Sequence, residues 1–291
     1  MLFEIIKIVF PVFTIIGIGY LFARWMKFDL DSLTNIMFYL LIPCLVFAYL
    51  VRADITWAEI GTVSAGAAAA MFGPGALCFL LPVRMRSPGL YLSAMFMNAG
   101  YMGLPLVAIA FGEGAITAAV IYIVAEGVVH FSLGIGIVSK ERSLKEITRL
   151  PIIYVTAFSL LLNFCHVGIP DFVYTPFRLL GDAVIPLMLF ALGYQLRSVR
   201  FSSVPAALAA SVIRNLGGMA VAIAFCHVAG VGGAERKVII LLSATPSAVV
   251  NFVIARKYNS DTDLVSSIVL LSTILSIGTI TLTLFLIERY F

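Results

Sequence analysis

The strongest constraint on this chain is a series of ten apolar stretches, each close to the length that crosses a bilayer. A membrane-spanning helix needs about 20 mainly apolar residues. We expect every stretch to be helical, because a backbone exposed to lipid must satisfy its own hydrogen bonds. The sixth stretch is short and is expected to borrow residues on both sides. The stretches cover residues 2–23, 33–50, 60–81, 90–111, 115–138, 152–166, 177–196, 204–228, 238–255 and 264–286.

Composition agrees with an all-α integral membrane protein of ten transmembrane helices. Of the 291 residues, 62% are hydrophobic and only 12% are charged, whereas about a quarter of the residues in a soluble domain are charged. Mean hydropathy is +1.08. The net charge of +4 does not indicate a nucleic-acid partner, because Lys and Arg cluster between the apolar stretches. The chain length leaves no room for a separate soluble domain, and the first stretch is interpreted as a retained helix rather than a signal peptide.

Two matching halves are indicated by motifs that recur about 140 to 145 residues apart. Ile42-Pro43-Cys-Leu-Val-Phe-Ala in the second stretch resembles Ile185-Pro186-Leu-Met-Leu-Phe-Ala in the seventh. Pro11 pairs with Pro151, and Pro105 with Pro246. Five stretches per half is an odd number, so the second half starts on the opposite face of the membrane. We therefore predict an inverted repeat, with residues 1–138 as the first half, 139–150 as a cytoplasmic linker and 151–291 as the second half.

The distribution of basic residues predicts the orientation in the plasma (inner) membrane. With the amino terminus outside, twelve Lys and Arg residues fall on the inner side and six on the outer side, and Arg214 lies inside a stretch. The positive-inside rule then places both termini outside and the linker in the cytoplasm. The inner residues are Arg24, Lys27, Arg84, Arg86, Lys140, Arg142, Lys145, Arg149, Arg197, Arg200, Arg256 and Lys257.

Two of the stretches carry signals of broken helices. The fourth contains Asn98-Ala-Gly100-Tyr-Met-Gly103-Leu-Pro105, and the ninth contains Ser243-Ala-Thr245-Pro246-Ser247-Ala-Val-Val-Asn251. A proline within a helix removes an amide donor and clashes with the preceding turn. Paired interruptions in corresponding spans of two halves are typical of a transporter's midplane binding site. The alternative is that these Gly and Pro residues have no role in binding, and that the glycines only allow neighbouring helices to pack closely.

These segments also carry a resemblance to a known family. The segment N-x-G-x-x-G-L-P-L at residues 98–106, the segment I-P-L-x-L-F-A-L-G at residues 185–193 and the late T-P-S segment resemble the auxin efflux carrier family. This family comprises bacterial permeases related to the plant PIN-formed auxin exporters. The resemblance covers nearly the whole chain. It implies ten helices in two inverted repeats, with the fourth and ninth helices broken at prolines and crossing as an X.

The same resemblance implies a function. Family members export small organic anions by an elevator-like motion of a transport domain against a scaffold, and they often form homodimers. It suggests that Pro105 and Pro246 are the crossover prolines and that Asn98 lies near the crossover. The chain departs from the plant proteins because it lacks their long central loop and their N-P-N-T-Y stretch. This favours a dicarboxylate or another carboxylate metabolite over auxin.

Charges inside apolar stretches are costly, at roughly 2.5 to 3.5 kcal/mol each at the helix centre on insertion scales, and are therefore candidates for function. Arg214 could neutralise an anionic substrate, pair with Glu126 or Asp182, or snorkel to an interface. Glu126 and Asp182 are candidates for ion coupling, with a protonated structural carboxyl for Glu126 and a simple cap for Asp182 as the alternatives. His130, one turn after Glu126, could share a proton or pack in the core.

The candidate substrate-binding residues come from the broken segments and the buried arginine. No metal, other cofactor or enzymatic motif is expected, because the four cysteines and three histidines are scattered and no hydrolase or phosphate-loop motif is present. The alternatives to an exporter are a sodium-coupled importer of the bile-acid-transporter-like fold and a non-transporting membrane sensor. The candidates are Asn98, Gly100, Gly103, Pro105, Thr245, Pro246, Ser247, Asn251 and Arg214.

Overall fold

The computed structural model describes residues 2–139, 151–197 and 204–291, and throughout these ranges the regular structure is helical. The linker predicted at 139–150 therefore lies almost wholly outside the described residues, as do Lys140, Arg142, Lys145, Arg149 and Arg200. Seven described helices are long and apolar enough to cross a membrane, and two shorter apolar helices, Ala99–Phe111 and Pro151–Phe164, accompany them. These segments follow nine of the ten apolar stretches expected from the sequence, including the short sixth one, and the ninth stretch, 238–255, is divided between two shorter helices, Gly233–Ser243 and Val250–Lys257.

In the first part of the chain, the helices are α1 (Leu2–Trp25), α2 (Leu30–Ile36), α3 (Ile42–Val51), α4 (Trp57–Leu77), α5 (Pro88–Met95), α6 (Leu104–Phe111), α7 (Glu113–Val129) and α8 (Ile135–Val138). In the second part, they are α10 (Pro151–Phe164), α11 (Asp171–Leu196), α12 (Val204–Val212), α13 (Gly218–Val228), α14 (Gly233–Ser243), α15 (Val250–Lys257) and α16 (Thr262–Tyr290). Single π-helical turns join α2 to α3, lead into α6, join α7 to α8 and join α12 to α13, at Met37–Leu41, Ala99–Gly103, His130–Gly134 and Ile213–Gly217.

Local sequence explains several helix ends. The Thr56 hydroxyl accepts the backbone N–H of Glu59, and the Glu59 carboxylate accepts the backbone N–H of Thr56, which is a capping box at the start of α4. Ser87 caps α5 by accepting the backbone N–H of Leu90, and Pro88 occupies the first helical position. The chain thus begins these helices at hydroxyl residues that satisfy otherwise unpaired amides.

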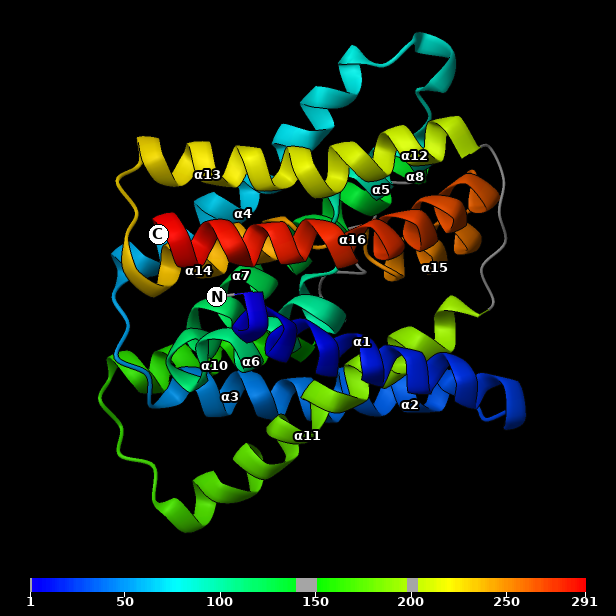
Figure 1. Ribbon diagram of the computed structural model, residues 1–291. Coiled ribbons are helices and arrows are strands. Elements are labelled where there is room, and N and C mark those ends of the chain that lie inside the picture. Colours follow the sequence, from blue (N-terminus) through cyan, green and yellow to red (C-terminus); the bar gives the residue numbers. More distant parts are fainter. Residues whose placement is uncertain (1, 140–150, 198–203) are drawn as a thin grey trace.

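The helices form two bundles that lie against each other (Figure 1). One bundle contains α1, α2, α3, α10 and α11, in which α11 packs along both α1 and α3, and α10 packs on α3. The second bundle contains α4, α5, α7 and α12–α16, with α4 against α7 and α13 and with α12 against α16. We call these the scaffold bundle and the crossing bundle. Both chain ends lie at the same end of the molecule in Figure 1.

Glycines allow α1 and α11 to approach each other closely in the scaffold bundle. A Cβ atom at Gly19 would lie 2.2 Å from the Phe190 carbonyl oxygen, and one at Gly193 would lie 1.9 Å from the Ile16 carbonyl oxygen. Both neighbours are backbone atoms of packed helices and cannot move aside cheaply. Small residues at such contacts are the usual means of bringing membrane helices together, because lipid-facing helices gain little from hydrophobic burial.

We predict that Gly19→Ala destabilises the protein by roughly 1–3 kcal/mol, because the added methyl overpacks the contact with α11. The matched control is Gly17→Ala on the same helix, where an added Cβ meets nothing within 4 Å. The measurement is thermal unfolding of the purified variants in detergent. Equal melting temperatures for the two variants would contradict the proposed role of Gly19.

Candidate functional site

The fourth and ninth apolar stretches are broken at the centre of the crossing bundle, and the two breaks pair with each other. The backbone N–H of Asn98 donates to the Pro246 carbonyl at 2.7 Å, and the N–H of Ala248 donates to the Phe96 carbonyl at 3.0 Å. Met97 and Ser247 thereby form an antiparallel bridge. Each break supplies hydrogen-bond partners that the other lost when its helix was interrupted, which is the requirement for irregular backbone at membrane depth.

The position of the first break corrects one expectation. Pro246 lies within the second break, as predicted, but the first break spans residues 96–98 and Pro105 lies beyond it, in the first turn of α6. The continuous helix Ala99–Phe111 has a π-helical turn, Ala99–Gly103, directly before this proline, and such a local change of hydrogen-bond register is a usual way in which a membrane helix accommodates proline. Pro105 is therefore not the counterpart of Pro246; Met97 and its neighbours are.

One buried arginine binds the carbonyl ends of both interrupted helices. Arg214 is fully buried. Its Nη1 donates to the carbonyls of Ala94 (3.0 Å) and Met95 (2.8 Å) at the end of α5, and its Nη2 donates to the Ser243 carbonyl (2.7 Å) at the end of α14. Nη1 also contacts the Ala70 carbonyl of α4 at 3.0 Å. A cation at the carboxyl end of a helix is stabilised both by these bonds and by the helix dipole.

This position settles the partners of Arg214. Within the described residues it forms no ion pair with Glu126 or Asp182, so the two pairings considered from the sequence are wrong, and its burial excludes snorkelling. It also does not line the cavity described below. Gly218, one turn later, leaves the space for it, because a Cβ there would lie 2.0 Å from Arg214 Nη2 and 2.3 Å from the Ser243 carbonyl oxygen.

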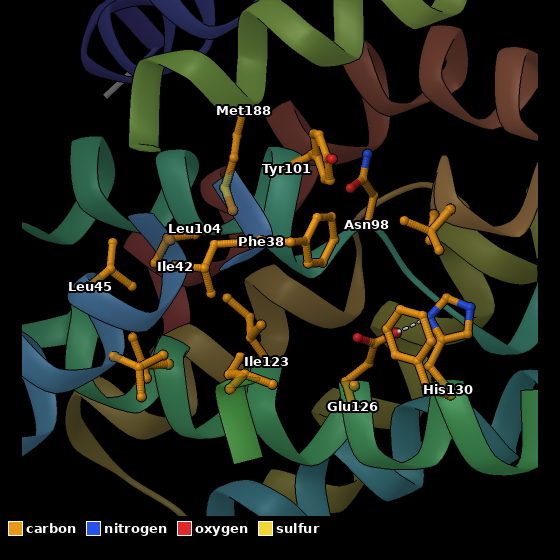
Figure 2. A pocket seen from close by; sticks show the side chains of 18 of the residues that line it. Phe38, Ile42, Leu45, Asn98, Tyr101, Leu104, Ile123, Glu126, His130 and Met188 are labelled. Atoms are coloured by element: carbon orange, nitrogen blue, oxygen red, sulfur yellow. Dashed lines mark ion pairs between the residues drawn. The ribbon is translucent and has the colours of Figure 1, made fainter. Parts of the chain in front are cut away.

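A cavity of about 100 Å³ lies between the two bundles, next to the crossing (Figure 2). The scaffold bundle contributes an almost wholly apolar wall, and the crossing bundle contributes residues of the first break, of the turn after it, and of α7. The polar side chains in the lining are Asn98, Tyr101, Glu126 and His130. No Lys or Arg is among the described lining residues.

The first break presents hydrogen-bond donors to this cavity. Asn98 is only 2% exposed, and its amide Nδ2 is buried without a hydrogen-bond partner in the structure. Gly100 also lines the cavity, and a Cβ there would meet nothing within 4 Å. The helical segments that start at Ala99 and Val250 both begin at the cavity, where their positive dipole ends favour an anion.

Glu126 and His130 form a buried pair at one side of the cavity. Oε1 of Glu126 lies 3.1 Å from Nδ1 of His130, and Nε2 of His130 lies 2.7 Å from Oδ1 of Asn251. The His130 ring stacks on Phe96, with ring centroids 4.3 Å apart. The Asn251 amide nitrogen in turn donates to the Phe96 carbonyl (3.1 Å) and to Ser247 Oγ (3.0 Å). These contacts join the cavity to both breaks.

The other predicted site residues hold the crossing together rather than line the cavity. Gly103 allows close approach to α14, since a Cβ there would lie 2.5 Å from Leu242 Cδ2. Thr245 donates its hydroxyl to the Leu242 carbonyl at 2.6 Å, and the backbone N–H of Ser247 donates to Ser272 Oγ at 3.1 Å. The structure thus brings Asn98, Gly100 and Glu126 together at the cavity, places Gly103, Thr245, Pro246, Ser247 and Asn251 around the crossing, and leaves Pro105 in α6 beyond it.

Asp182 lies away from the cavity, in a polar cluster that joins the two bundles. Its carboxylate accepts the Tyr49 hydroxyl at 2.9 Å and Arg178 Nε at 2.8 Å. Nη2 of Arg178 also pairs with Glu113 Oε1 of α7 at 2.6 Å. Thr117 donates its hydroxyl to the Tyr49 carbonyl at 3.0 Å. These neighbours fit a structural carboxylate better than a coupling site in the cavity.

Several cavity residues were not singled out from the sequence. Tyr101 lies inside the quoted fourth-stretch motif and carried a detectable signal, as an aromatic hydroxyl next to two glycines. Ile42, Leu45 and Met188 of the scaffold bundle lie inside the repeated Ile-Pro segments quoted above, but like Phe38 they are ordinary apolar residues of membrane helices. Nothing in their residue type separates them from lipid-facing neighbours.

Comparison with known proteins identifies the class. The profile of the family described as "Membrane transport protein" matches residues 138–284. The chain belongs to this family, the auxin efflux carrier type of permease. Family members are transporters and not enzymes. The protein is therefore a multi-pass membrane transporter, in agreement with its apolar helices.

Two relatives of this permease align over most of its length. An "Uncharacterized transporter" of Methanothermobacter thermautotrophicus is 28% identical, over 86% of this chain and 86% of the relative. A "Putative malonate transporter" of Rhizobium meliloti is 27% identical, over 98% of this chain and 96% of the relative.

We predict that Arg214→Met destabilises the permease by about 3 kcal/mol, because it leaves buried carbonyls at the ends of α5 and α14 without donors. Arg214→Lys should recover only part of the loss, since an ammonium group cannot reproduce the planar fork of a guanidinium. Arg24→Met, at an exposed arginine, is the control. Thermal unfolding in detergent measures the effect, and a melting temperature of Arg214→Met equal to that of the control would contradict it.

Proposed function

We propose that this permease is a secondary carrier that exports a small organic anion of the carboxylate class. The observation that carries the proposal is the unpaired, buried amide of Asn98 at a cavity where two interrupted helices present their amino-terminal ends. An unpaired buried donor costs about 1–3 kcal/mol, and a carboxylate oxygen would satisfy it. The positive helix ends would neutralise part of the anion's charge without a lysine or arginine in the lining.

The size and walls of the cavity favour a compact anion with an apolar middle. Its polar groups gather on the crossing bundle, whereas the scaffold wall is apolar. A short dicarboxylate such as malonate fits this division, and one full-length relative is described as a malonate transporter. An inside-negative potential contributes roughly 2.3 kcal/mol per charge per 100 mV. This drives an anion outward, so export needs no coupling ion for its direction.

We further propose that the chain forms ten spans in two inverted halves, residues 1–138 and 151–291. The helix packing supports this arrangement, because equivalent helices of the two halves make equivalent contacts. The first span, α1, packs on the second span of the other half, α11, and reciprocally α10 packs on α3. Within the crossing bundle the third and fifth spans of each half pack together, α4 on α7 and α12 on α16. With the basic residues counted above, both termini would lie outside.

Transport in this scheme follows an elevator motion of the crossing bundle along the scaffold bundle. The cavity lies between the bundles, with one wall apolar and therefore poor in directional bonds. The polar contacts between bundles include the Glu113–Arg178 ion pair and the Thr117–Tyr49 hydrogen bond. Such bonds are few among the described residues, so little would need to break for the bundles to slide, and those that exist would hold one end state.

We predict that labelled malonate moves across the membrane of proteoliposomes at a rate that increases with an imposed potential. Asn98→Ala should weaken malonate binding about tenfold or more, by loss of a hydrogen bond to a charged group. Gly100→Leu should block transport by filling the cavity, whereas Gly136→Leu, at a glycine that also has open space but does not line the cavity, should retain it.

Two results would count against the carrier proposed here. Equal malonate flux in the Asn98→Ala, Gly100→Leu and wild-type proteins would contradict the proposed site. Flux that disappears when sodium is replaced by choline would instead favour the sodium-coupled importer. The same vesicles serve for both comparisons.

We predict that covalently joining the two bundles stops transport. A short bismaleimide would join cysteines introduced at Glu113 and Arg178, whose side chains lie in contact, in a Cys165→Ser background that removes the exposed native thiol. Each single-cysteine variant, treated identically, is the control. Full flux in cross-linked protein would contradict the sliding motion.

A further inference from the structure

We infer that Glu126 and His130 form a proton-binding site through which binding of the anion is coupled to uptake of one proton. This inference rests on the proposed function and adds the coupling ion to it. Both residues line the cavity, and their side chains are 8% and 3% exposed, respectively. Figure 2 shows the Glu126 carboxyl beside the interior of the cavity, with His130 next to it.

Hydrogen bonding around Asn251 determines how the His130 ring is protonated. The Asn251 amide nitrogen has two acceptors, the Phe96 carbonyl and Ser247 Oγ, so Oδ1 is the atom that faces His130. Oδ1 can only accept, and Nε2 of His130 must therefore carry a hydrogen. This leaves Nδ1 of the ring facing Glu126 Oε1, which has no other hydrogen-bond partner.

The gap of 3.1 Å between Nδ1 and Oε1 therefore has room for a single proton. With the proton present, the pair is neutral as a whole, either as imidazole with carboxylic acid or as imidazolium with carboxylate. Without it, a ring lone pair faces a carboxylate, and the pair carries one negative charge. The proton bound there is the difference between a neutral and an anionic cavity wall.

An anion in the cavity binds the protonated and the unprotonated pair with different affinity. The described lining contains no Lys or Arg, so a carboxylate substrate next to unprotonated Glu126 meets a like charge in a site shielded from water. Binding of the anion therefore favours the protonated pair. By linkage, the protonated pair binds the anion more tightly by the same factor.

The other groups around the pair do not compete for this role. Tyr101 lines the cavity from the turn after the first break and hydrogen-bonds to Thr34, Tyr122 lies one turn away on α7, and Arg214 acts on Glu126 electrostatically from behind the crossing. The other described residues that line the cavity are apolar or glycine. Phenol and guanidinium groups ordinarily keep one charge state between about pH 5 and 8. Glu126 and His130 are thus the groups whose proton occupancy responds to the anion.

The contacts also explain how proton occupancy could act on the moving part of the carrier. His130 precedes α8 in the π-helical turn at His130–Gly134, and Asn251 lies in the first turn of α15. The pair therefore touches the cavity on one side and the second break on the other, through Asn251 and Ser247. A change of charge at Glu126 alters the bond that orients Asn251 toward both breaks.

Calorimetric titration of the wild-type protein with malonate tests the inference directly. At one pH, above the last ionisation of malonate, the titration is repeated in buffers of different ionisation enthalpy. We expect uptake of close to one proton per malonate, and malonate affinity that falls up to about tenfold per unit rise in pH. Glu126→Gln should bind malonate with no proton uptake, and Glu288→Gln, at an exposed carboxylate far along α16, should behave as wild type.

The outcomes separate this inference from the function on which it rests. Malonate binding to wild type without proton uptake, or unchanged uptake in Glu126→Gln, overturns the coupling role and leaves the carrier proposal standing. Absence of binding by malonate and by other short mono- and dicarboxylates overturns both. If Glu126→Gln fails to fold, the comparison of buffers with the wild-type protein still decides the question.

Discussion

The interaction on which the rest of this structure depends is the contact of one buried guanidinium with the carbonyl ends of two interrupted helices. A bilayer provides no water to satisfy backbone groups, so a broken span is stable only where protein replaces the missing partners. Arg214 supplies donors to α5, α14 and α4 from a single planar group. The same bonds offset the cost of burying its charge, because each carbonyl end carries partial negative charge.

The contacts of Arg214 also determine which ends of the helix dipoles face the cavity. The carboxyl ends of α5 and α14 point toward Arg214, so the following segments, which start at Ala99 and Val250, have their amino ends at the cavity. The negative helix ends therefore lie at Arg214, and the positive helix ends lie at the cavity. Backbone geometry thus turns two positive helix ends toward the cavity, with Arg214 supporting the crossing from outside the cavity.

The sequence correctly predicted an all-helical membrane protein, and seven described helices are long and apolar enough to cross a membrane, because the bilayer dictates the length and apolarity of such helices. It also located two interrupted spans, since glycine and proline within a stretch weaken a helix wherever the chain folds. It misplaced the first break at Pro105, because the break is fixed by hydrogen bonds from residues 96–98 to a distant segment. For Arg214 it offered an anionic substrate, a carboxylate or an interface as partner, because backbone carbonyls, its actual partners, have no signature in residue type. Glu126 and His130 were recognised from their spacing, but their link to Asn251 is purely tertiary.

The mutual pairing of the two breaks has a consequence for biosynthesis. The backbone N–H of Asn98 finds its acceptor in Pro246, and the carbonyl end of α5 finds its donor in Arg214. Both partners leave the ribosome long after the fourth stretch has been made. A nascent chain that has emerged only as far as α8 therefore holds an unfinished fourth span, which must wait in the translocon or at the lipid interface. The amino-terminal half becomes fully membrane-compatible only after the chain has been made as far as Pro246.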